Sequence, residues 1–375
     1  MTIMNKNMRI EFIDGLRGFM ALCVVYIHYS ALFYPTLFLG VYNFSTFVNI
    51  FFIISGFVLS YRFWQNKKIE PLTGAALKRY IRLTVAPLVS ILIVYALLKL
   101  DLIFNVEVCN VTNALDVMKI FLAIEPNFIN ALYEGLFGMY FNYNQVTSYN
   151  PVLWTMSIEF KGSILSLAFL ALFGKIKNRL PLYIIFSMIS LMTDIVYLEF
   201  ITGIFLADFI YSEDFKKYHT IFLEKKFCAA ILTLLGIFLT FYALESEFAI
   251  YQKINFSIFN HVSYNAEIFY HKIAAIMIVV AVFQWNFLRK IFSLKFLTLV
   301  GKYSFALYVI HAPLMVSLSA YVFLQIWNGG ASLAMCIFVA TLVGILSTAA
   351  ASVLIYKFVD MPAGNLAKRF QKFFE

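Results

Sequence analysis

Charged residues are scarce in this chain. Asp, Glu, Lys and Arg make up 13% of its 375 residues, whereas 62% of the residues are hydrophobic and the mean hydropathy is +0.83. Soluble domains carry about 25% charged residues. An apolar excess of this size is more than a water-soluble core of this length hides. The composition therefore argues against a soluble enzyme and predicts an all-α polytopic membrane protein.

Cysteines and common catalytic motifs are also lacking. Three of the four cysteines, Cys23, Cys228 and Cys336, fall inside expected helices, so no disulfide framework is expected. The chain has no G-x-S-x-G, H-E-x-x-H, G-x-x-x-x-G-K-[ST] or C-x-x-C. These absences argue against a hydrolase triad, a zinc site and a nucleotide-driven motor. Arginine, histidine and glutamate chemistry remains, without a metal.

Apolar runs of about 20 residues, the length that crosses a bilayer, recur along the chain. We expect about ten transmembrane helices, near residues 14–34, 44–63, 83–105, 151–173, 180–198, 200–212, 227–243, 266–287, 297–324 and 331–356. Residues 180–212 are too long for one span, so a hairpin near Glu199 is expected. With that hairpin, most of the 29 Lys and Arg residues fall on one side. By the positive-inside rule that side is cytoplasmic and holds both termini.

Neither repeats nor flexible linkers divide the chain, so residues 1–375 are expected to form one membrane-embedded domain in the cell (inner) membrane. The net charge of +9 lies in short clusters between apolar runs, which is typical of membrane orientation and contact with membrane lipids and argues against nucleic acid. An extracytoplasmic loop is expected at about 106–150 and a short basic cytoplasmic tail at about 358–375. The acidic and aromatic side chains of that loop suit a polyhydroxylated ligand, and an interfacial aromatic belt explains them equally well.

The first apolar segment carries a cation and a histidine in I-D-G-L-R-G-F-M-A-L-C-V-V-Y-I-H. Arg17 and His28 are eleven residues apart, so they share one helix face, roughly 16 Å from each other along the axis. Ionisable groups are costly in lipid and normally face a bundle interior or a wet cavity. This pair is therefore the first candidate functional site.

A second basic pair, Arg79 and Arg82, immediately precedes the expected third span on the cytoplasmic side. Residues three apart share a helix face, so the two guanidiniums form one patch suited to phosphate. Isolated basic pairs at this position more often contact lipid headgroups or set topology. Together with Arg17 on the same side, they match the phosphates of coenzyme A, with its pantetheine arm reaching inward to His28.

Two further motifs place polar groups inside expected spans. In L-W-T-M-S-I-E-F-K, Glu159 lies in the outer part of the fourth span and points about 200° away from Lys161. It is interpreted either as a protonated structural group or as a residue that holds an acceptor hydroxyl or orients His28. In G-K-Y-S-F-A-L-Y-V-I-H, Tyr308 and His311 share a face, and His311 is expected to be structural or supporting.

These motifs, taken in order, resemble acyltransferase family 3. The resemblance rests on I-D-G-L-R-G with its histidine, F-F-I-I-S-G-F at 51–57, R-x-x-R at 79–82, L-W-T-M-S-I-E at 153–159 and G-K-Y-S-F-A-L-Y-V-I-H at 301–311. It implies a ten-helix enzyme that moves an acyl group, commonly acetyl, from cytoplasmic acyl-CoA to a hydroxyl of a cell-surface glycan such as lipopolysaccharide or capsule, or of a lipid-linked saccharide. The family often continues the glutamate motif with Glu and Gln, whereas Phe160 and Lys161 follow here.

The residues and the resemblance together predict roles. His28 and Glu159 are the catalytic candidates, and Arg17, Arg79 and Arg82 are expected to bind acyl-CoA, which is a co-substrate. The supporting candidates are Asp14, Ser157, Tyr308 and His311. His28 either deprotonates the acceptor hydroxyl or carries the acyl group itself. The alternative is a transporter or flippase for a lipid-linked sugar or another anionic substrate. The oligomeric state stays open.

Overall fold

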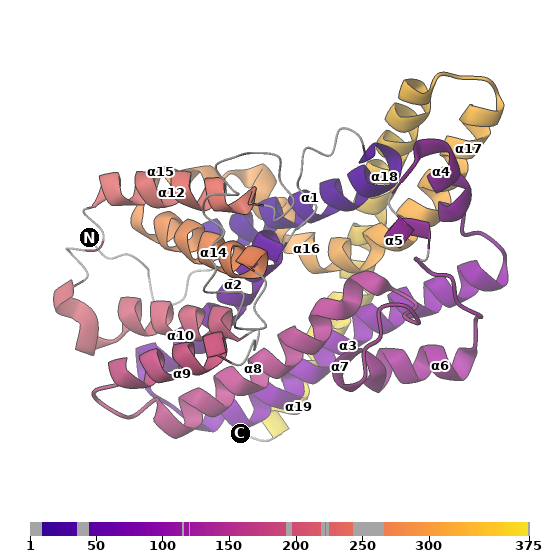
Figure 1. Cartoon of the computed structure of the whole chain (residues 1–375). Coiled ribbons are helices and arrows are strands. Elements are labelled where there is room, and N and C mark those ends of the chain that lie inside the picture. The colour runs from indigo at the N-terminus through magenta and orange to yellow at the C-terminus, as the bar shows by residue number, and fades with distance from the viewer. Residues whose placement is uncertain are drawn as a thin grey trace. The chain divides into compact units, whose positions relative to one another are not determined.

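The computed structural model describes residues 10–35, 45–114, 116–119, 121–192, 197–218, 222, 225–242 and 266–373. Within these ranges every regular element is a helix and no strand occurs, which confirms the all-α class (Figure 1). The chain folds as two compact units that alternate along the sequence. Unit 1 contains Met1–Ala21, Gly40–Leu72 and Gly162–Lys302, and unit 2 contains Leu22–Leu39, Thr73–Lys161 and Tyr303–Glu375.

Each unit has helices of its own. Those of unit 1 are α2 (Ser45–Asn66), α9 (Leu180–Met192), α10 (Leu198–Tyr211), the turn η4 (Glu213–Phe215), α12 (Lys226–Thr240), α14 (Ala266–Gln284) and α15 (Asn286–Phe292). Those of unit 2 are α4 (Asn105–Thr112), α5 (Asp116–Lys119), α6 (Phe128–Tyr133), η2 (Glu134–Gly138), α7 (Met139–Phe141), η3 (Pro151–Leu153), η6 (Met315–Ser319), α17 (Ala320–Asn328), α18 (Leu333–Ile355), η7 (Tyr356–Asp360) and α19 (Met361–Phe373). Four helices contribute residues to both units: α1 (Glu11–Phe33), α3 (Glu70–Lys99), α8 (Trp154–Phe173) and α16 (Lys295–Leu314).

Long apolar helices dominate the described residues. Seven helical stretches there are long and apolar enough to cross a membrane. All ten segments expected from the sequence coincide with helices, but α9, α10 and α12 have only 13, 14 and 15 residues. At 1.5 Å per residue these three are roughly 20 Å long, short of a bilayer core. The protein is thus a multi-pass membrane protein, and a count of about ten spans stays a prediction.

The expected third span is wrong at its start. It was placed at 83–105, whereas α3 runs from Glu70 to Lys99. Pro71 follows the first residue of the helix, where its missing N–H would have had no intrahelical partner in any case. Arg79 and Arg82 therefore lie inside a long helix, not ahead of it.

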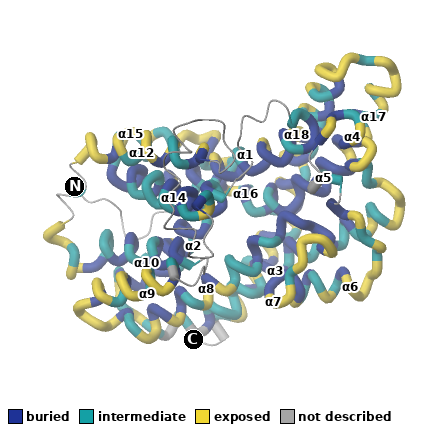
Figure 2. Tube along the Cα trace, in the orientation of Figure 1, coloured by how far each residue is buried: buried dark blue, intermediate teal, exposed yellow. Residues whose placement is uncertain are grey.

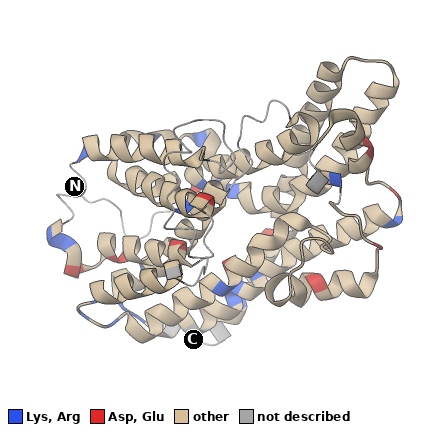
Figure 3. Cartoon of the chain, viewed as in Figure 1, with Lys and Arg blue, Asp and Glu red and all other residues tan. Residues whose placement is uncertain are grey.

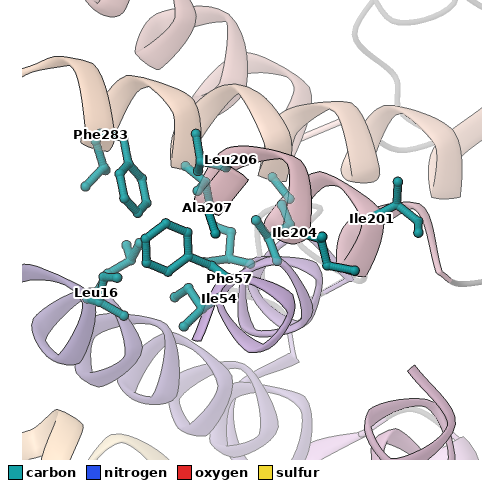
Figure 4. Close-up of a cluster of buried hydrophobic side chains, with 14 of the residues drawn as sticks. Leu16, Ile54, Phe57, Ile201, Ile204, Leu206, Ala207 and Phe283 are labelled. Carbon is teal, nitrogen blue, oxygen red and sulfur yellow. The ribbon is translucent and has the colours of Figure 1, made fainter. Parts of the chain in front are cut away.

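Unit 1 is held by direct helix-to-helix backbone contact and by aromatic packing. A Cβ at Gly203 of α10 would collide with the Ile53 carbonyl of α2, and one at Gly56 would collide with the Phe200 carbonyl, so only glycine permits this approach. Phe57 of α2 meets Phe283 of α14, with ring centroids 4.8 Å apart. The surrounding apolar side chains include those labelled in Figure 4, namely Leu16, Ile54, Ile201, Ile204, Leu206 and Ala207.

Buried ion pairs are the other feature of unit 1. Figure 3 shows how few charged residues the helices carry. Arg179 donates two hydrogen bonds to the Asp208 carboxylate, at 2.7 and 2.8 Å, and the two side chains are 2% and 0% exposed. Lys272 of α14 lies 3.0 Å from Glu199 of α10, also fully buried. Such pairs persist in an apolar interior because each charge is matched by its partner.

Lys67 lies just beyond the end of α2, beside the first of these ion pairs. Its Nζ is 3.9 Å from the centre of the Trp64 ring, and Arg179 lies over the same ring. Burial, helped by the charge of Arg179, lowers the pKa of Lys67 from 10.5 to about 8, while Asp208 and Asp214 oppose that shift.

This lowered pKa predicts a pH dependence of stability. Between about pH 8 and pH 10.5 the unfolded state binds more protons than the folded state at Lys67, so stability rises with pH across that window. We expect the thermal unfolding midpoint in detergent to rise from pH 8 to pH 10 more steeply in the wild-type protein than in Lys67→Gln. If the midpoint rose equally with pH in the two proteins, the lowered pKa of Lys67 would be contradicted.

Candidate functional site

The second half of α1 is enclosed by unit 2. Most residues of α1 are buried or intermediate (Figure 2). His28 is 9% exposed, and the neighbouring Tyr29 and Phe33 are almost fully buried. The Tyr29 hydroxyl lies 3.2 Å from Ser319 Oγ, and Phe33 packs on Phe323. A Cβ at Gly344 of α18 would collide with the Tyr29 ring, so α18 also approaches closely. His28 is therefore held in the interior of this unit, as its position in an apolar span predicts.

A second histidine lies against His28. His311 of α16 is fully buried, and its Nε2 is 3.3 Å from His28 Nδ1. His28 Nδ1 is also 2.9 Å from the Val24 carbonyl, one turn back on α1. His311 Nδ1 lies 2.7 Å from the Tyr308 carbonyl. The two imidazoles thus form a buried pair, each anchored to the backbone of its own helix.

The turn that carries His311 is braced by neighbouring segments. Pro313 has no N–H, so the Val309 carbonyl four residues earlier loses its helical partner. Ser90 of α3 and Asn150 donate to this carbonyl instead, at 2.6 and 2.9 Å. The helix then widens into the π-helical turn η6, a feature that is frequent at functional sites. α3 and the segment before α8 therefore fix the position of the histidine turn.

Tyr308 joins the same turn to the start of α8. Its hydroxyl donates to the Val152 carbonyl and accepts from the Thr155 hydroxyl, 2.7 Å away. The supporting role expected of Tyr308 from the sequence stays a prediction. Ser157, the other supporting candidate on α8, donates to the Tyr140 carbonyl at 2.8 Å.

Arg79 and Glu159 form an ion pair between α3 and α8. Their side chains are 18% and 13% exposed. The sequence analysis placed Arg79 at the cytoplasmic end and Glu159 toward the opposite side, and two groups in contact cannot lie at different depths, so that placement is wrong. The reason is the early start of α3, which carries Arg79 more than two turns into the helix. Arg82, three residues further on, is exposed.

Residues 128–141, within the expected outer loop, are helical and pack along α3. Phe128 meets Tyr95, a Cβ at Gly135 would collide with Leu88, and the Tyr80 hydroxyl donates to the Leu136 carbonyl at 2.8 Å. Residues 128–141 therefore contact α3 at successive positions, the last of which, Tyr80, is next to Arg79. Tyr140 then packs against Phe160, the residue after Glu159, with centroids 4.8 Å apart.

Arg17 belongs to unit 1, where its guanidinium lies 4.0 Å from the Asp14 carboxylate and is 30% exposed. The glycines around it have a packing role. A Cβ at Gly15 would collide with the Phe292 carbonyl, and one at Gly18 would collide with the Leu297 carbonyl. Gly301 of α16 is pressed in the same way against the Asp14 carbonyl. The I-D-G-L-R-G motif thus contains Arg17 and also the glycines at which α1 packs closely against α15 and α16.

Of the nine residues proposed from sequence, seven lie in unit 2 and two in unit 1. The structure brings together His28 with His311, and Arg79 with Glu159, and neither pairing was expected. In the sequence, the only indication of these pairings is that two histidines and two opposite charges lie inside apolar segments. Because each pair joins helices far apart in the chain, the sequence periodicity within one helix does not reveal it.

A family model described as an acyltransferase domain matches residues 10–355, nearly the whole chain. No curated protein and no solved structure matches the chain.

Proposed function

The chain belongs to acyltransferase family 3, and from this premise we propose that it moves an acyl group, acetyl above all, from cytoplasmic acyl-CoA to a hydroxyl of a glycan. The acceptor in this proposal is a cell-surface or lipid-linked saccharide, such as lipopolysaccharide or capsule, and the location is the cell (inner) membrane. The observation that carries the proposal is the buried His28, which α1 and His311 hold inside a membrane-embedded unit.

His28 supplies the base that such a transfer requires. In the direct route, its ring takes the proton of the acceptor hydroxyl while the hydroxyl oxygen attacks the thioester carbonyl. The new C–O bond forms, the C–S bond breaks, and the proton passes to the departing thiolate. In the covalent route, the histidine nitrogen attacks first and an acyl-imidazole forms, from which the hydroxyl takes the acyl group. A burst of released coenzyme A in the absence of acceptor distinguishes the second route from the first.

Arginine side chains suit the phosphates of the donor. Arg82 is exposed on α3, and Arg79 lies one turn away, already paired with Glu159. We assign phosphate binding to Arg82 and Arg79, with Glu159 orienting the Arg79 guanidinium and lying close enough to a bound donor to contact the acceptor. Arg17 keeps its proposed role in donor binding from the sequence. Guanidinium forks bind phosphate oxygens in pairs, which lysine does not do.

Replacing Arg82 by alanine tests the donor. We expect the KM for acetyl-CoA to rise by about 10- to 100-fold with little change in kcat, because a hydrogen bond to a charged group contributes about 1.5–3 kcal/mol and this one is made equally before and during reaction. The measurement is transfer of labelled acetyl from acetyl-CoA to surface glycan by the purified protein in detergent.

Lys161→Ala is the matched control, because Lys161 is also an exposed cation and lies on α8. Its KM for acetyl-CoA should stay within about two-fold of the wild-type value, as for surface changes away from a site. Titration calorimetry with acetyl-CoA shows whether the protein binds the proposed donor at all. A wild-type protein that binds no acetyl-CoA would refute the proposed function and favour the transporter alternative.

A further inference from the structure

The hydrogen-bond pattern of the histidine pair fixes where each ring carries its proton. A backbone carbonyl only accepts, so the 2.9 Å contact between His28 Nδ1 and the Val24 carbonyl places a proton on His28 Nδ1. The 2.7 Å contact between His311 Nδ1 and the Tyr308 carbonyl places a proton on His311 Nδ1 in the same way. In a neutral ring the other nitrogen then carries the lone pair.

This assignment makes the contact between the rings attractive. His311 Nε2, which carries a lone pair, faces the Nδ1–H of His28 at 3.3 Å, and that N–H is shared between His311 and the Val24 carbonyl. The other neutral tautomer of His28 would turn a lone pair toward both the carbonyl and the His311 lone pair. The other tautomer of His311 would set two N–H groups against each other. One arrangement of protons therefore satisfies all three contacts.

We propose that His311 is a positioning residue for acyl transfer: it accepts the hydrogen bond from His28 Nδ1–H, holds His28 in the tautomer with its lone pair on Nε2, and stabilises the imidazolium that forms when Nε2 takes the acceptor proton. This inference rests on the proposed function of His28. The Nε2 atom is then the base or nucleophile of the reaction. A hydrogen bond from a charged donor is shorter and stronger than one from a neutral donor, so the interaction strengthens as the proton is transferred.

Several hydrogen bonds hold the His311 ring in one orientation. Tyr308, which accepts from the His311 ring, is itself bound through its hydroxyl to the Val152 carbonyl and to Thr155. One residue later, the Val309 carbonyl is held by Ser90 and Asn150. A ring anchored in this way presents its Nε2 in one direction, which a residue that merely fills space does not need.

The decisive measurement is the tautomer of His28. In protein labelled with ¹⁵N-histidine, nitrogen NMR separates protonated from unprotonated ring nitrogens, and the spectrum of His28→Ala assigns the His28 signals among the five histidines. We expect a protonated Nδ1 and an unprotonated Nε2 in the wild-type protein. In His311→Leu only the Val24 carbonyl still favours a proton on Nδ1, so the share of the tautomer protonated on Nε2 should rise. A wild-type His28 with its proton on Nε2 would overturn the inference, whatever the activity of the protein.

Kinetics of two substitutions complete the test. His311→Leu removes the acceptor atom, and we expect kcat to fall by about 10²- to 10⁴-fold while the KM for acetyl-CoA stays within about two-fold. In His311→Gln the side-chain Oε1 lies near the place of the lost Nε2 and accepts the same hydrogen bond, so kcat should recover by at least about ten-fold. Equal kcat values for the two variants, each binding acetyl-CoA as the wild type does, would show that His311 only fills space.

The two proposals fail in different ways. The proposed function is refuted if His28→Ala keeps full transfer activity or if the wild-type protein does not bind acetyl-CoA. The positioning role is refuted if the tautomer populations of His28 are the same in His311→Leu as in the wild-type protein. Acetyl-CoA binding and the thermal midpoint of each variant show whether the fold is intact before the kinetics are compared.

Discussion

Replacing His28 by alanine lowers kcat for acyl transfer by about 10²- to 10⁴-fold, the range that a positioned general base contributes. The physical reason is that no other described ring nitrogen is placed to replace it: the nearest one, His311 Nε2, contacts His28 at Nδ1 and not at the Nε2 proposed as the base, and the Tyr308 carbonyl anchors the His311 ring in that position. The KM for acetyl-CoA should change little, because the proposed phosphate contacts lie on other residues. Initial rates with labelled acetyl-CoA measure both constants.

His271→Gln is the matched control for this substitution. His271 of α14 is also a fully buried histidine, with its Nε2 3.0 Å from the Tyr242 carbonyl, but it lies in unit 1 and carries no proposed role. Glutamine keeps a polar group at the same place, so transfer should stay within about three-fold of wild type. A His28→Ala protein as active as this control would refute the catalytic role.

The largest expected effect on stability comes from the Arg179–Asp208 pair. In Arg179→Met the Asp208 carboxylate, which is 0% exposed, loses both hydrogen bonds from the guanidinium and keeps the one from the Tyr183 hydroxyl at 3.0 Å. Removing one partner of a buried pair costs about 3–5 kcal/mol, because the remaining charge stays buried without compensation. Unfolding in detergent by increasing denaturant, followed by tryptophan fluorescence, measures the loss.

Two comparisons separate a buried charge from lost packing. In the double variant Arg179→Met with Asp208→Leu both charges of the buried pair are removed, and the other carboxylate that Arg179 contacts, on Asp214, is 43% exposed, so most of the stability should return. The pair between Lys216 and Glu213 has side chains 67% and 82% exposed, and Glu213→Gln should cost under about 1 kcal/mol. A double variant no more stable than Arg179→Met would show that packing, not charge, dominates at this site.

The helical architecture was predictable because its signal is local. Each expected span is a run of apolar residues, and each run forms a helix among the described residues. The beginning of α3 was missed because residues 70–82 include several polar and charged side chains, and hydropathy alone does not distinguish a helix that extends beyond the apolar region from a loop. Pro71 in the first turn was the signal that would have located the helix start.

The sequence identifies individual candidate residues but not how they are arranged. His28, Arg79 and Glu159 stand out because charged and titratable groups inside apolar segments are uncommon. Their partners did not stand out. His311 is 283 residues from His28, and only the packing of α16 against α1 brings them together. The ion pair of Arg79 and Glu159 likewise depends on how α3 and α8 pack, which the periodicity of either helix leaves open.

The proline in α16 has a consequence for how unit 2 responds to its donor. The carbonyl that Pro313 leaves without a helical partner is held by Ser90, which lies on the same helix as Arg82, roughly 12 Å further along its axis. α3 cannot slide past α16 without giving up that bond inside an apolar interior. Arg82, proposed to bind phosphate, and His311, proposed to orient the base, therefore lie on two helices that this bond couples. A shift of α3 along its axis would also strain the turn that holds His311.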